Sequence, residues 1–92
     1  MTATVTDNPE KSRYELPTEA GPAVALYRLT PGTMVITYTE VPWPLRGRGV
    51  GAQLLHGAMQ DIRARGLKVV AGCGYVAQFL AEHADAYADL RR

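Results

Sequence analysis

The sequence predicts an α+β domain in which an antiparallel β-meander precedes an α-β-α unit, in the order βββ-α-β-α. Two observations lead to this fold class. The first half of the chain is rich in β-branched and aromatic residues, separated by short turns that contain proline and glycine. From about Gly49 onward the apolar residues instead recur at helical spacing. A chain of 92 residues has room for one small domain with a thin core.

Three strands are expected before the first helix. Residues 1–12 are polar and are expected to form a flexible N-terminal arm, with a single domain over residues 13–92. The expected strands are Arg13–Leu16, Ala23–Leu29 and Thr33–Val41. The third has the strongest strand character, because nearly all of its residues are β-branched or aromatic. Pro42 and Pro44 each lack a backbone donor, so the ladder should end there.

The second half of the chain is expected to fold as α-β-α. An amphipathic helix is predicted over residues 49–65, and Gly66 is suited to the position just after its C-terminal end. Its apolar face would comprise Val50, Leu54, Ala58 and Ile62. A buried strand over residues 67–71 and a second helix over residues 75–83 follow, with a short helical tail through Leu90.

Composition excludes several classes of protein. Ten basic residues against nine acidic ones give a net charge of +1, which argues against bulk electrostatic binding of nucleic acid. One cysteine excludes a disulfide framework and a multi-thiolate zinc site, so no metal is expected. No apolar run is long enough for a membrane span, and the N-terminus lacks the features of a signal peptide. A cytoplasmic protein is therefore expected.

The most informative segment lies between the third strand and the first helix, at residues 45–51. Its alternating glycines allow close approach of a ligand to the backbone, and the helix that follows presents unpaired N–H groups with a positive dipole end. Arg46 and Arg48 add two positive charges. The pattern predicts a site for a phosphate or diphosphate. The alternative is a glycine-rich turn with two solvated arginines and no ligand.

The segment Arg46-Gly47-Arg48-Gly49-Val50-Gly51 resembles the Arg/Gln-x-x-Gly-x-Gly/Ala signature of the GCN5-related N-acetyltransferases. Residues 39–42, 66–70 and 73–76 are similar to a short, single-domain type of this family, and the resemblance covers most of residues 8–90. It implies a compact acetyltransferase-like fold, acetyl-CoA or CoA as cofactor, and N-acetyl transfer to an amine. Tyr38 departs from the relatives, which often carry His at that place.

The resemblance also implies where the cofactor binds. The residues implied for its diphosphate are Arg46, Gly47, Arg48, Gly49, Val50 and Gly51. The pantetheine arm would pair with the backbone near Glu40, Val41 and Trp43, where the strand before the signature splays from the strand over residues 67–71. Cys73 and Tyr75 would complete the cofactor contacts.

Two residues are candidates for catalysis. Cys73 lies between a strand and a helix whose dipole favours the thiolate, so this residue could take the acetyl group covalently. The alternative is that Cys73 only lines the cofactor site. Glu40 is a candidate general base, directly or through water, and the alternative is a solvated carboxylate on an edge strand. Trp43 is expected more as a core residue than as an acceptor contact, and His56 as a surface residue.

Three functions remain to be compared. The first is an N-acetyltransferase whose acceptor is a small-molecule or peptide amine, acting as a monomer or homodimer. The second is an acyl-CoA-binding module or sensor without efficient turnover. The third is an interaction domain that binds nucleic acid through its arginines, which the near-neutral charge and the 8% aromatic content disfavour.

Overall fold

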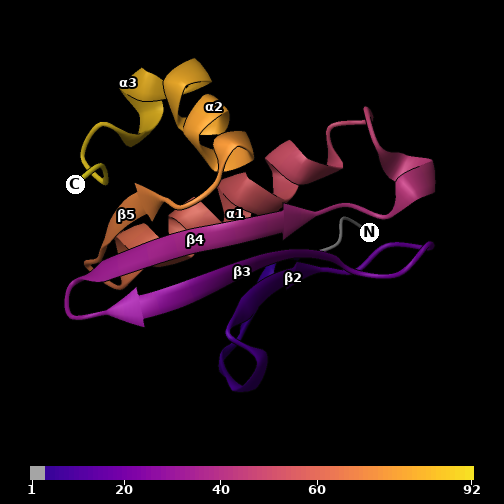
Figure 1. Cartoon of the computed structure of the whole chain (residues 1–92), viewed down its shortest axis with the longest axis horizontal. Coiled ribbons are helices and arrows are strands. Elements are labelled where there is room, and N and C mark those ends of the chain that lie inside the picture. The colour runs from indigo at the N-terminus through magenta and orange to yellow at the C-terminus, as the bar shows by residue number, and fades with distance from the viewer. Residues whose placement is uncertain (1–3) are drawn as a thin grey trace.

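The computed structural model describes residues 4–92, and in this part of the chain five strands form one sheet in the order β1-β2-β3-β4-β5 (Figure 1). The strands are β1 (Thr6–Asn8), β2 (Arg13–Leu16), β3 (Ala23–Thr30), β4 (Thr33–Glu40) and β5 (Lys68–Ala71). Strands β1 to β4 pair antiparallel, and β4 pairs with β5 in parallel. The predicted α+β class and the predicted meander are confirmed, with β1 as an addition.

Strand β1 corrects the expectation of a flexible arm over residues 1–12. Thr6–Asn8 pairs with β2, and the 3-10 turn η1 (Pro9–Lys11) connects the two strands. The hydroxyl of Tyr27 donates to Asp7 Oδ1 at 2.6 Å, and Arg65 Nη1 lies 3.0 Å from Asp7 Oδ2. These partners of Asp7 are distant in the sequence. The polar composition of residues 1–12 therefore led to the wrong prediction for Thr6–Asn8. Residues 1–3 of the expected arm lie outside the described residues.

Three α-helices follow the meander: α1 (Val50–Ala64), α2 (Gly74–Glu82) and α3 (Ala84–Tyr87). The predicted helical segments are confirmed, with small shifts at their ends. Helix α1 lies across one face of the sheet and crosses over from β4 to β5 (Figure 1). None of the helices within residues 4–92 has the length and apolar character needed to cross a membrane.

The core lies between α1 and the sheet. The residues of α1 that are buried there are Leu54, Leu55, Ala58, Met59 and Ile62. They pack with buried side chains of the strands, including Tyr14, Tyr27, Met34 and Ile36. Burial of each large apolar side chain contributes roughly 1.5–3 kcal/mol, so this layer fixes α1 and with it the position of the helix N-terminus.

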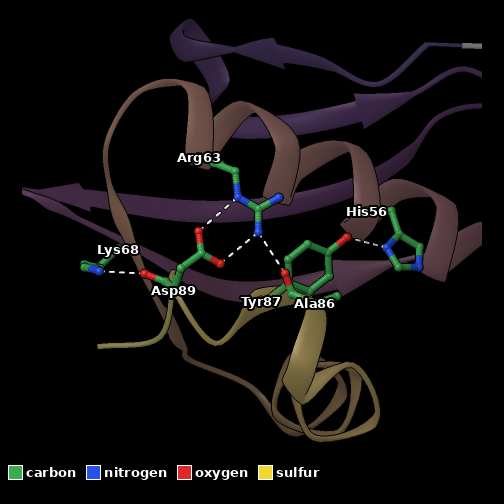
Figure 2. A network of polar contacts seen from close by, with 6 residues as sticks. All are labelled: His56, Arg63, Lys68, Ala86, Tyr87 and Asp89. Atoms are coloured by element: carbon green, nitrogen blue, oxygen red, sulfur yellow. Dashed lines mark hydrogen bonds and ion pairs between the residues drawn. The ribbon is translucent and has the colours of Figure 1, made fainter.

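The C-terminal segment is held against α1 and β5 (Figure 2). The Arg63 guanidinium donates to Ala86 O and to Asp89 Oδ1, each at 2.8 Å. Val69 N donates to Leu90 O at 2.7 Å, which forms an isolated bridge beside β5. The segment thereby covers the outer edge of β5 and leaves the other side of the molecule for the site described below.

Strand β4 contains a bulge that the sequence pattern did not predict. Tyr27 pairs with Ile36 but Leu26 pairs with Tyr38, so Thr37 is an extra residue on β4. Directly opposed residues in an antiparallel pair point to the same face of the sheet. Because Ala25 belongs to the core and pairs with Thr39, Thr39 faces α1, whereas Tyr38 and Glu40 face the opposite side.

Candidate functional site

A cleft opens where β4 and β5 separate. Strand β5 ends at Ala71, opposite Ile36, and Gly72 N donates to Ile36 O at 2.7 Å before the chain turns into α2. Strand β4 continues to Glu40, and no strand in residues 4–92 pairs with this last part on the β5 side. The cleft has a volume of about 420 Å³. It is lined by Tyr38, Thr39, Glu40, Val41, Leu45, Arg46, Gly47, Gly49, Val50, Gly51 and Tyr75.

The N-terminus of α1 forms one wall of this cleft, and its first backbone N–H groups have no partner among residues 4–92. Gln53 N donates to Gly49 O at 3.0 Å, so the N–H groups of Val50, Gly51 and Ala52 precede the first hydrogen bond of the helix. No side chain in the described part of the chain caps this end. The dipole of the 15-residue helix adds a partial positive charge at the same place.

Two glycines give the loop before α1 its shape. Gly47 and Gly49 have φ angles of 80° and 79°, in the left-handed region that other residues rarely adopt. A Cβ atom at either position would meet no atom of the described residues within 4 Å, so the space above this backbone is open. The glycines therefore serve the conformation and the accessibility of the loop.

The two arginines of the loop have different positions. Arg46 lines the cleft, and its Nε donates to Val41 O at 3.3 Å, which joins the loop to the end of β4. Arg48 is exposed and lies outside the lining of the cleft. Both charges lie beside the unpaired N–H groups of α1 in the sequence, so this end of the cleft is positive.

Gly51 has a packing role that sequence reasoning did not identify. A Cβ atom here would overlap the hydroxyl of Tyr75, which lies against the first turn of α1. Tyr75 is half-exposed and separates the cleft from a second hollow of about 120 Å³. The second hollow is lined by Ala52, Tyr75, Gln78, Phe79, Glu82 and His83.

The end of β4 supplies polar groups to the other wall. The hydroxyl of Tyr38 donates to Glu40 Oε1 at 3.0 Å, and this carboxylate raises the pKa of Tyr38 above its ordinary value. Both side chains are exposed. Thr39 Oγ1 is buried without a hydrogen-bond partner among the described residues. Of the lining residues, Tyr38, Thr39 and Leu45 were absent from the predicted site, because the bulge that places the first two depends on pairing with β3.

Besides Arg48, two residues of the predicted site lie outside the lining of the cleft. Cys73 is the N-cap residue of α2, is partly buried, and packs against the core. Trp43 lies in the 3-10 turn η2 (Trp43–Leu45) and is 78% exposed, so the interpretation of Trp43 as a core residue is wrong. The prolines on either side of Trp43 lack a backbone donor, so this segment does not continue the ladder of β4.

His56 was expected on the surface and is instead partly buried between α1, α2 and α3. Its ring packs edge-on against Phe79 and His83, with centroid distances of 4.9 and 4.7 Å. Its Nδ1 is hydrogen-bonded to the hydroxyl of Tyr87 (Figure 2). Burial, and secondly the nearby His83, lower the pKa of His56 below its ordinary value.

The chain is similar to known proteins over most of its length. The family model described as GCN5-related N-acetyl-transferase matches residues 13–90. A solution structure of a GCN5-like candidate N-acetyltransferase from Staphylococcus aureus is 26% identical, with a TM-score of 0.71. The match covers 96% of this chain and 86% of that chain. A search of curated proteins gave no match.

These findings place the chain in the class of acetyltransferases with an α+β fold. The chain belongs to the GCN5-related N-acetyltransferase family. The resemblance derived from the glycine-rich signature and its neighbouring segments is thereby confirmed.

Proposed function

We propose that the chain binds acetyl-CoA in the cleft between β4 and α1 and transfers the acetyl group to an amine. One observation carries the proposal: an uncapped helix N-terminus, preceded by two left-handed glycines, opens into a cleft beside the split between β4 and β5. Such an end binds anions, which suits the diphosphate of CoA.

The residues of the cleft fit the parts of this cofactor. The N–H groups of Val50, Gly51 and Ala52 would donate to the diphosphate, and Arg46 and Arg48 would add charge-assisted contacts. The free edge of β4 after Ile36 offers backbone donors and acceptors to the amides of pantetheine. A cleft of about 420 Å³ lies in the range of ligand-binding pockets.

The chemistry that the protein must add is small. Acetyl-CoA supplies an activated thioester, and the chain must orient the acceptor nitrogen and accept its proton. Glu40 lines the cleft next to Val41, at the end of β4, and is placed to take that proton directly or through a water molecule. We therefore assign the role of general base to Glu40.

Direct transfer is the route that the cleft favours, because Cys73 is not among its lining residues. In the covalent alternative, the Cys73 thiolate attacks the thioester carbonyl, the bond to the CoA sulfur breaks, and the thiolate of CoA leaves. The amine then attacks the acetyl-cysteine, loses a proton, and releases the thiol. Incubation with acetyl-CoA and measurement of the intact mass distinguishes the routes, since only the covalent one adds an acetyl group that Cys73→Ala removes.

Release of free CoA thiol with a panel of amines tests the proposed function. The wild-type protein should form free CoA from acetyl-CoA only when an amine is present. Arg48→Ala should raise the KM for acetyl-CoA roughly five-fold, the size of one exposed charge contact, whereas the matched Arg28→Ala on β3 should not change it. Binding of acetyl-CoA without thiol release with any amine would instead support the acyl-CoA-binding module.

A further inference from the structure

Residues 4–92 leave one face of the sheet without a covering helix. Helix α1 covers the other face, and the buried side chains of α2 and α3 join the core that α1 forms there (Figure 1). Side chains alternate between the two faces along a strand. The strand residues that lie between the core positions therefore point away from α1, onto a surface that we call the open face.

Three rows of paired residues cross the open face. From one end to the other, the rows are Glu15, Val24 and Glu40, then Arg13, Leu26 and Tyr38, and finally Arg28, Val35 and Val70. The apolar side chains lie on β3, β4 and β5, and Leu26, Val35 and Val70 are only partly buried. Contact with another molecule would remove this apolar area from water, which favours association.

The charges of the open face lie at its two ends. Arg28 is exposed at one end and forms no ion pair within residues 4–92. Glu40 is exposed at the other end, where the nearby Arg46 reduces its negative field without forming an ion pair with it. Arg13 and Glu15 compensate each other through an ion pair of 2.6 Å. The open face therefore has a positive end with an unpaired charge and a weakly negative end.

A second copy of the chain is the partner that this pattern fits. In a symmetric dimer both copies use the same surface. A two-fold axis that crosses the strands at the row of Leu26 reverses the strand direction in the partner copy. The positive end of each copy then lies over the weakly negative end of the other, so Arg28 faces Glu40 of the partner copy. The two rows with Leu26 face each other, as in sheets that pack face to face.

The size of the open face sets the strength of this contact. Strands about 4.8 Å apart with about 3.3 Å per residue give roughly 400 Å² of sheet per copy. Two such faces bury about 800 Å², which is less than stable dimers bury and is typical of a transient contact.

We propose that the open face joins two copies of the chain in a weak, reversible homodimer, with Arg28 of each copy paired to Glu40 of the other. Glu40 also lines the cleft, so the second copy borders the cleft on the side away from α1. The dimer engages the carboxylate that we assigned as the general base, and the monomer is therefore the active form. This last consequence rests on the proposed function, whereas the contact itself does not.

Sedimentation velocity over about a hundred-fold range of protein concentration tests the contact. The wild type should shift from monomer towards dimer as the concentration rises. Arg28→Glu and Glu40→Arg should each stay monomeric, because like charges then face each other. An equimolar mixture of the two variants should form dimers again, since one copy carries two acidic groups and the other two arginines. The matched Arg91→Glu variant should behave as the wild type, because exposed Arg91 pairs with the core residue Val69.

Three results would overturn the inference: a wild type that stays monomeric, an Arg28→Glu variant that dimerises as the wild type does, or a mixture of the two variants that fails to associate. Kinetics test the consequence for the site. The specific activity of the wild type should fall as its concentration rises, whereas that of Arg28→Glu should stay constant. A dimer that forms without any change in specific activity would overturn the role of Glu40 as the base and leave the contact standing.

Discussion

Gly51 belongs to the ligand-binding signature and also leaves room for the side chain of Tyr75 to pack against α1. Sequence reasoning assigned Gly51 to the diphosphate site, because the signature places a small residue there. The structure adds that the Tyr75 hydroxyl occupies the space of a Cβ atom. This tyrosine is half-exposed, so it can move when the space is filled.

A double-mutant cycle tests this contact. Gly51→Ala should destabilise the wild type, because the new methyl group displaces Tyr75. In a Tyr75→Ala background the same substitution should be neutral or stabilising by up to about 1 kcal/mol, since alanine favours helix over glycine. Urea unfolding of the four proteins measures the coupling. Equal effects of Gly51→Ala in both backgrounds would show that the contact has no energetic weight.

Because of the hydrogen bond from Tyr27 to Asp7, the free energy of unfolding should change with pH in the alkaline range. Burial, and secondly this bond, raise the pKa of Tyr27 from 10.0 to about 12. The folded protein therefore keeps the phenol proton in a range where the unfolded chain has lost it, and stability falls as pH rises from about 10 to 12. Tyr14, whose pKa burial also raises, contributes to the same fall.

Unfolding experiments between pH 9 and 12 measure this effect. Tyr27→Phe should lower the free energy of unfolding at neutral pH by roughly 1 kcal/mol, through loss of the bond to Asp7. It should also make the alkaline fall shallower than in the wild type. A fall of unchanged steepness in Tyr27→Phe would show that this phenol does not carry the linkage.

At the scale of elements, the contact of α3 with α1 and α2 depends on aromatic rings, on the hydrogen bond between Tyr87 and His56, and on the one that Arg63 donates to Ala86 O. His56 faces Phe79, His83 and Tyr87, and the Arg63 guanidinium lies 5.5 Å from the centre of the Tyr87 ring. A proton on His56 would add a positive charge close to these groups. The neutral form of His56 is therefore the one that the packed helices favour.

Mild acid should loosen this packing. Because the pKa of His56 is lowered from 6.5, its contribution to stability is complete above pH 6.5 and is lost as pH falls through the lower folded-state value. Thermal unfolding between pH 7 and 5 should show this loss in the wild type. His56→Gln, which retains a group that can bond to Tyr87, should give a flatter profile. Identical profiles would assign the acid sensitivity to other groups.

For the whole molecule, most of the fold can be predicted from local sequence patterns. The rest depends on contacts between segments that are distant in the sequence. The strands over 13–40, the amphipathic helix and the glycine-rich loop are visible in the residue order. Strand β1 is not, because it is held in place by the partners of Asp7, which are Tyr27 in β3 and Arg65 just after α1. The bulge in β4 depends on register with β3, and the environment of His56 depends on where α3 packs.

The same distinction applies to the site. The glycine-rich signature was enough to predict a ligand site at the N-terminus of α1, with Arg46 and the glycines, because these residues are contiguous in the sequence. It did not predict Tyr38 and Thr39, which reach the cleft through the bulge and through the early end of β5. It also did not predict that Trp43, Arg48 and Cys73 lie outside the lining of the cleft.

The most direct test of the account is calorimetric titration of acetyl-CoA into wild-type protein and two glycine variants. Gly49 and Gly66 share a left-handed φ and open surroundings, and they lie at opposite ends of α1, about 22 Å apart by helix rise. Tryptophan at either position therefore carries the same backbone strain, but only Gly49→Trp obstructs the helix N-terminus. The account predicts micromolar binding by the wild type and Gly66→Trp, and none by Gly49→Trp. Equal binding by both variants, or no binding by the wild type at millimolar acetyl-CoA, would contradict it.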